Sequence, residues 1–307
     1  MKKLLNLIKL SGGIVLLAFL TARFLAGSAG LTAYAFGEHA LEPSDVSAAQ
    51  REKREVPIIM YHNITKNQSQ LGKYAISPKE MENDLIYLRN NGYETVLMQD
   101  LIDYVNGEGE LPEKPIVLTF DDGNSGDYNY LLPLLKKYDM KAVCSIIGKI
   151  TDDYTKEGGA SKPHLDWEQV REMQKDGRIE IQNHSYNMHG YNGSGKLQSE
   201  SADTYRARLR ADLEKTQAKI KDVTGFTPTT FVYPLGVIGN GSLEVLKGLG
   251  FRASLSCWEG INTVTKGDAD GLFKMRRAIR RSGQPVSDVL SDAYLRMKRE
   301  RANSVRG

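Results

Sequence analysis

The regular alternation of two apolar patterns constrains the fold of this chain more than any other feature. From residue 56 onwards, segments with the composition of β-strands alternate with segments that have the apolar spacing of helices. The expected strands are residues 56–64, 94–98, 116–122, 141–148, 179–182, 229–232 and 251–257. The expected helices are residues 78–91, 127–138, 166–175, 203–223 and 241–249. This order indicates βαβ units and a parallel sheet, and about seven such strands suit a closed (β/α) barrel better than an open sheet.

Four of the expected strands end in polar or conformationally special residues. These ends are Tyr61-His62-Asn63, Asp121-Asp122, Asn183-His184-Ser185 and Tyr233-Pro234-Leu235-Gly236. Barrels of this type carry their chemistry at the carboxyl ends of the strands. We therefore expect these four segments to converge on one rim.

The strand at 116–122 ends in two adjacent carboxylates, Asp121 and Asp122, followed by Gly123. Each charge loses hydration and repels the other at the mouth of a buried strand, so the pair needs a cation or a proton between its members. The alternative is a simple polar turn, because Asp and Gly are common turn residues.

His184 and His189 are separated by five positions. On a helix or a strand this spacing would direct the two rings away from a common point, whereas from a loop they could share a metal ion. Two imidazoles and one carboxylate form a recognised catalytic zinc set, in which a water completes the shell. Without further signals, two loop histidines with no ligand role are the simpler interpretation.

The N-terminal part of the chain has a different character. Residues 1–9 contain three lysines and residues 10–22 are mostly apolar, a pattern typical of a secretory signal. We expect residues 1–36 to be a signal peptide or an uncleaved membrane anchor, which places the working domain in the cell envelope or outside the cell. Residues 37–55 are expected to be a linker, residues 56–290 the globular domain, and residues 291–307 a basic tail.

Charge and cysteine content exclude two classes of protein. The formal net charge of +3 is too small to indicate nucleic-acid binding. Two cysteines, Cys144 and Cys257, cannot form a disulfide framework. Both lie in expected strands, so we expect free thiols, with a single disulfide as the alternative.

Three motifs together resemble those of the polysaccharide deacetylases, the NodB-homology group or carbohydrate esterase family four. They are TFDDG at 119–123, the His-Ser pair with a second histidine at 184–189, and a YPxG turn at 233–236. The segments IIMYHNI and SPKEMENDLIYLRNNGY resemble in particular the branch that contains the poly-N-acetylglucosamine deacetylases. The similarity extends from about residue 56 to residue 283.

The resemblance implies a distorted (β/α) barrel and one divalent metal, usually zinc, with cobalt or nickel as alternatives. It assigns Asp122, His184 and His189 as the metal ligands. It assigns Asp121 as the general base, which takes the proton of a metal-activated water as that water attacks an acetamide carbonyl.

The same resemblance assigns the backbone N–H of Leu235 as a donor to the oxyanion of the tetrahedral intermediate. Leu235 replaces the family's aromatic residue at this position. Tyr233, in the same turn, and Trp258, which follows the last expected strand, are expected to contact the substrate.

Two further departures from the family pattern concern the base and the acid. Val232 occupies the position of an arginine that braces the base, and no histidine follows His189 to supply the general acid. We therefore expect His62 to act as the acid or at least to line the site, with a packing histidine as the alternative. The candidates for bracing Asp121 are Arg276, Arg277 and Arg280.

These expectations describe an exported, metal-dependent enzyme that hydrolyses acetamide groups of an N-acetylated cell-envelope glycan. Peptidoglycan and a poly-N-acetylglucosamine-like polymer are the candidate substrates. The alternatives are an O-acetyl esterase and a carbohydrate-binding pseudoenzyme with the same barrel. No nucleic-acid partner is expected, membrane contact is expected only through the N-terminal segment, and the sequence gives no indication of the oligomeric state.

Overall fold

The computed structural model describes residues 52–158 and 163–304, so the expected leader and most of the expected linker lie outside the described residues. The strands are β1 (Lys53–Val56), β2 (Ile58–Tyr61), β3 (Asn63–Ile64), β4 (Ala75–Ile76), β5 (Glu94–Thr95), β6 (Pro115–Asp122), β7 (Ala142–Ile146), β8 (Ile179–Asn183), β9 (Thr230–Val232), β10 (Ala253–Leu255), β11 (Asn262–Thr265) and β12 (Ala278–Ile279). The helices are α1 (Pro78–Asn90), α2 (Met98–Asn106), α3 (Leu132–Tyr138), α4 (Gly148–Glu157), α5 (Trp167–Asp176), α6 (Ala202–Thr224), α7 (Ser242–Gly248) and α8 (Val286–Ser304). Shorter helical turns are η1 (Gln68–Gln70), η2 (Asp127–Leu131), η3 (Pro234–Gly236) and η4 (Asp270–Leu272).

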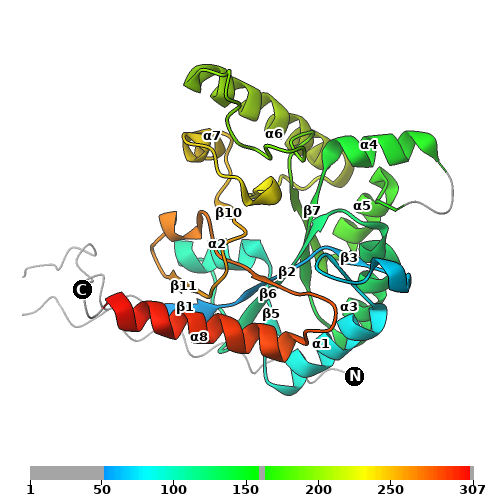
Figure 1. Ribbon diagram of the computed structural model, residues 1–307, viewed down its shortest axis with the longest axis vertical. Helices are drawn as coiled ribbons and strands as arrows, with labels where there is room; N and C mark the ends of the chain where they lie inside the picture. Colours follow the sequence, from blue (N-terminus) through cyan, green and yellow to red (C-terminus); the bar gives the residue numbers. More distant parts are fainter. Residues whose placement is uncertain (1–51, 159–162, 305–307) are drawn as a thin grey trace, which may run out of the picture. The chain divides into compact units, whose positions relative to one another are not determined.

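A curled parallel sheet forms the centre of the domain (Figure 1). Its strand order is β10-β9-β8-β7-β6-β2-β12, and β5 pairs with the first residues of β6. A parallel bridge between Leu255 of β10 and Met275, shortly before β12, brings the two edges of the sheet together. The expected distorted (β/α) barrel of about seven parallel strands is therefore confirmed.

Strand β6 contributes to two separate cores. Ile116, Leu118 and Phe120 lie in the apolar layer between the sheet and the surrounding helices, whereas Val117 lies in the core inside the barrel. Because side chains alternate between the faces of a strand, Asp121 is directed to the same interior face as Val117. The strand thus delivers a carboxylate into the barrel at its carboxyl end.

Helix α2 is an element that the sequence patterns did not predict. β5 covers only Glu94–Thr95, and the chain then enters α2, so the predicted strand at 94–98 is wrong at its end. Leu101, Ile102 and Val105 of α2 are buried in the core inside the barrel. Helices α4 and α8 were also not predicted. The predicted strand at 141–148 ends at Ile146, and residue 148 already begins α4.

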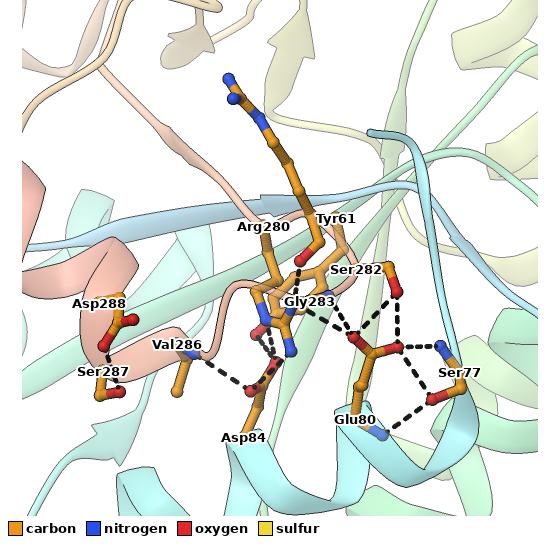
Figure 2. A network of polar contacts seen from close by, with 11 residues as sticks. Tyr61, Ser77, Glu80, Asp84, Arg280, Ser282, Gly283, Val286, Ser287 and Asp288 are labelled. Atoms are coloured by element: carbon orange, nitrogen blue, oxygen red, sulfur yellow. Dashed lines mark hydrogen bonds and ion pairs between the residues drawn. The ribbon is translucent and has the colours of Figure 1, made fainter. Parts of the chain in front are cut away.

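A buried polar network connects α1 to the C-terminal part of the barrel (Figure 2). Asp84 of α1 accepts a hydrogen bond from Nε of Arg280 at 2.7 Å and another from the Tyr61 hydroxyl at 3.2 Å. It also accepts the backbone N–H of Val286, the first residue of α8, at 3.3 Å. Glu80, one turn earlier on α1, accepts further hydrogen bonds from the segment before α8. The network therefore fixes the segment that follows β12.

Helix α8 packs against α1 and β12 and includes most of the expected basic tail (Figure 1). Its buried side chains are Val286, Val289, Leu290, Ala293 and Met297. Among the helices that the structure describes, none combines the length and the apolar character needed to cross a membrane.

Candidate metal centre and active site

A sharp turn at the end of β6 separates the two adjacent carboxylates. Asp122 has a φ of 79° and Gly123 a φ of 71°, both in the left-handed region. A Cβ at Gly123 would lie 3.0 Å from Cγ2 of Ile146, so a larger residue would meet both strain and crowding. The turn directs Asp121 toward the barrel interior and Asp122 toward the loop after β8.

Asp122 lies beside both predicted histidine ligands. Its Oδ1 is 3.5 Å from Nε2 of His184 and 3.2 Å from Nε2 of His189. The ligand atoms of the three residues all lie within 4.8 Å of one another. A tetrahedral zinc ion with bonds of 2.0–2.1 Å separates its ligands by about 3.3 Å, so this spacing fits one ion.

The state of Asp122 also fits a metal ligand. Its Oδ1 is buried, and within the described residues it has no partner with hydrogen-bond geometry, although the two imidazoles are close. Burial alone would raise the pKa of Asp122, but the adjacent imidazoles of His184 and His189 hold it well below its usual range. The carboxylate is thus ionised and available to a cation.

A hydrogen bond to the backbone fixes the orientation of the His184 ring. Its Nδ1 lies 2.8 Å from the carbonyl oxygen of Val232, which can only accept, so Nδ1 is the donor in this contact and Nε2 faces Asp122. His189 is more exposed, and the adjacent Asp122 carboxylate raises its pKa. The structure therefore brings the three predicted ligands together in a competent arrangement.

Asp121 forms a buried ion pair with Arg277. Nη1 and Nη2 of Arg277 lie 2.8 Å and 2.9 Å from the two carboxylate oxygens, and Arg277 is fully buried. Its Nε donates to the carbonyl of Ser256 at 2.8 Å and its Nη1 to Thr119 at 3.2 Å. Burial would raise the pKa of Asp121, but the charge and hydrogen bonds of Arg277 together with the nearby imidazoles of His184 and His62 outweigh burial and lower it. Asp121 is consequently ionised at neutral pH.

The other two arginines considered for this brace lie elsewhere. Arg276 is partly exposed and pairs with Glu300 at 2.7 Å. Arg280 pairs with Asp84. Their proposed contact with Asp121 is therefore wrong, since each side chain is committed to a different carboxylate.

His62 lies just after β2 and faces the same carboxylates. Its ring packs edge-on against Tyr74, with the ring centroids 4.8 Å apart. Within the described residues its Nδ1 is buried without a hydrogen-bond partner. Burial lowers the pKa of His62, and the nearby charges of Asp121 and Asp122 offset this lowering only in part. The structure thus places His62 near both carboxylates, with one ring nitrogen unpartnered among the described residues.

The three residues expected to contact the oxyanion or the substrate have different environments. Leu235 has a φ of 56°, and its side chain is 52% exposed. Trp258 is 53% exposed, and its carbonyl accepts the N–H of Arg277 at 2.8 Å, so its backbone adjoins that of the residue that pairs with Asp121. Tyr233 is fully buried with its hydroxyl 3.0 Å from Oγ of Ser242, so its expected substrate contact is wrong.

One histidine that the sequence did not indicate as part of the site lies close to Asp122. His164 is partly buried, and its ring stacks on that of Tyr154 with the ring centroids 5.5 Å apart. Burial lowers the pKa of His164, and the charge of Asp122 offsets this lowering only in part. Its position before a helix gave no signal of this placement.

Cys144 and Cys257 are both free, as expected.

Comparison with known proteins gives consistent matches. Residues 108–254 match the family model described as polysaccharide deacetylase. The chain is 26% identical over 235 residues to the poly-β-1,6-N-acetyl-D-glucosamine N-deacetylase of Escherichia coli (strain K12), which covers 69% of this chain and 35% of that protein. It is 29% identical over 216 residues to the YxkH protein of Bacillus subtilis (strain 168), covering 69% and 68% of the two chains. The solved structure of IcaB from Ammonifex degensii has a TM-score of 0.60 at 26% identity, covering 73% of this chain and 91% of that one. The chain thus spans about a third of the length of the Escherichia coli relative.

Proposed function

We propose that this chain, in which residues 108–254 match the polysaccharide deacetylase family model, is a metal-dependent hydrolase that removes acetyl groups from an N-acetylated cell-envelope glycan. The observation that carries the proposal is the cluster of Asp122, His184 and His189 beside an ionised Asp121. A relative's activity on poly-β-1,6-N-acetyl-D-glucosamine supports a polymer of that type as the first candidate substrate, with peptidoglycan as the second.

Asp122, His184 and His189 would hold one divalent ion, for which zinc is the first candidate and cobalt or nickel the alternatives. Two imidazole nitrogens and one carboxylate oxygen suit these metals and leave positions open for water and substrate. When bound, the ion supplies Lewis-acid chemistry that acidifies the attacking water and polarises the acetamide carbonyl.

Asp121 acts as the general base. Arg277 keeps it ionised and orients its plane through two parallel hydrogen bonds. Each carboxylate oxygen uses one lone pair in this pairing and keeps another, so Asp121 can still accept the proton of the attacking water. Arg277 thereby serves in place of the arginine that Val232 replaces.

Three further residues complete the proposed mechanism. The N–H of Leu235, which lies with its exposed side chain in the turn after β9, stabilises the oxyanion of the tetrahedral intermediate. His62 donates a proton to the leaving amine, which would otherwise depart as an unstable anion. The exposed indole of Trp258 contacts the sugar. We further propose that residues 1–36 direct export or anchor the protein, and that the domain works in the cell envelope or outside the cell.

The proposal is tested by acetate release from the full chain loaded with zinc, cobalt or nickel. The substrates are poly-β-1,6-N-acetylglucosamine oligomers, peptidoglycan and an O-acetylated xylan. We expect metal-stimulated acetate release from an N-acetylated glycan and its loss in Asp121→Asn. Release from the ester alone would identify an O-acetyl esterase, and binding without any release would identify a carbohydrate-binding protein.

His62→Ala tests the acid. Loss of a general acid lowers kcat by about 10²–10⁴-fold, and we expect this loss without any change in metal content. Metal content is measured on the same sample by elemental analysis. A variant with full turnover would remove His62 from the mechanism.

Arg277→Gln tests the brace of the base through the pH dependence of kcat/KM. Without the guanidinium, burial dominates and raises the pKa of Asp121; since the base acts ionised, the acidic limb of the profile moves to higher pH. Arg277→Lys keeps the charge and should shift the limb less. Arg276→Gln, one position away and paired with Glu300, is the matched control and should leave the profile unchanged. An unshifted limb in Arg277→Gln would contradict the assignment.

A further inference from the structure

The segment that carries both histidines has no regular secondary structure. Residues 184–189 follow β8 without forming a helix or a strand, and Ser185 has a φ of 76°. Positive φ is uncommon for residues other than glycine and persists only where the surroundings enforce it. The spacing of His184 and His189 therefore depends on contacts made by the residues between them.

Asp212 of α6 binds the middle of this segment. Its Oδ1 accepts the N–H of Tyr186 at 2.7 Å, and its Oδ2 accepts the N–H of Asn187 at 2.9 Å. Both carboxylate oxygens are thus used on consecutive backbone donors. An asparagine could accept only one of these hydrogen bonds, and an alanine neither.

The remaining backbone N–H groups between the histidines bind within the segment or to its neighbour. The N–H of Ser185 donates to Oδ1 of Asn183 at 2.8 Å, and the N–H of Met188 donates to Oγ of Ser185 at 3.1 Å. The N–H of each residue from 185 to 188 therefore has a side-chain acceptor. Asp212 is the one acceptor among them that comes from a distant part of the chain.

The carbonyl groups of the same turn bind the N-terminus of α4. The N–H of Gly148 donates to the carbonyl of Ser185 at 3.0 Å, and the N–H of Lys149 donates to that of Tyr186 at 2.9 Å. A Cβ at residue 148 would lie 2.8 Å from Oγ1 of Thr216 and 2.9 Å from Cδ2 of Tyr186, so only glycine permits this approach. The turn is held between α4 and α6.

Helix α6 holds the side chain of Tyr186 as well as its backbone. Nζ of Lys215 lies 3.7 Å from the centroid of the Tyr186 ring, and the Tyr186 hydroxyl donates to Asp152 at 2.8 Å. Asp152 also pairs with Lys219 at 2.8 Å. Asp212, Lys215 and Lys219 are spaced to lie on one face of the helix. This face of α6 is therefore the support against which the turn is built.

We propose that Asp212 is a positioning residue for the metal centre, because it sets the spacing of His184 and His189 by fixing the backbone between them. The inference rests on the proposed function, in which these histidines bind the ion. Removing part of a carboxylate from water is costly, and partial burial raises the pKa of Asp212. Asp212 binds the backbone about halfway between the two proposed ligands, so its hydrogen bonds affect the distance between His184 and His189.

Zinc affinity of the full chain tests the proposal without reference to turnover. The variants are Asp212→Ala and Asp212→Asn, and the matched control is Asp222→Ala, an exposed aspartate on the same helix. Affinity is measured by competition with a chromogenic chelator, and the Tm of each metal-free protein is recorded. Removing an outer support of a metal site weakens binding by about 10–100-fold. We expect this loss in Asp212→Ala, a smaller loss in Asp212→Asn, and none in the control.

The outcomes separate this inference from the proposed function. Parent-like zinc affinity in both Asp212 variants, with only a lower Tm, would show a purely structural role and overturn the inference while leaving the function intact. Failure of the parent itself to bind zinc, cobalt or nickel would overturn both. If Asp212→Ala does not fold, Asp212→Asn carries the same test, because it keeps one of the two acceptors and the size of the side chain.

Discussion

Two adjacent carboxylates at the end of a buried strand are the constraint on which this structure depends. Like charges on neighbouring residues repel, and burial adds a further cost to each. The left-handed turn at Asp122 resolves the conflict by sending the two groups to different partners. Asp121 meets a guanidinium inside the barrel, whereas Asp122 meets two imidazoles on the rim. The pair is thereby divided into an ionised acid free of the ion and a carboxylate suited to hold one.

The protonation state of the proposed base is coupled to the closure of the barrel. Arg277 lies 156 positions beyond Asp121, in the segment that brings the last strand beside β10 and β2. The buried contact between Asp84 and Arg280 fastens this same segment to α1. On the other side of the site, α4 and α6 hold the histidine segment through Gly148 and Asp212. The proposed base therefore depends on the C-terminal segment of the barrel, whereas the two histidines depend on α4 and α6.

The barrel and the cluster of Asp122, His184 and His189 could be predicted from the sequence, because the strand patterns and the order of the motifs are visible in the sequence itself. The short apolar run at 94–98 did not show where β5 ends and α2 begins, because buried strands and buried helices use the same apolar residue types. Tyr233 was misplaced because a strand-end residue can face the core as readily as the rim. Selecting Arg277 among three arginines required the pairing at the barrel's closure, and Asp212 resembles any polar residue of an amphipathic helix. Such long-range contacts leave no local signal.

The central claim is that one ion is held by Asp122 and the two histidines while Asp121 stays unligated. Anomalous X-ray diffraction from crystals of the zinc-loaded protein tests it most directly. The account predicts a single strong peak within bonding distance of the side chains of Asp122, His184 and His189, with the Asp121 carboxylate still paired to Arg277. A peak elsewhere, or one coordinated by Asp121, would contradict it.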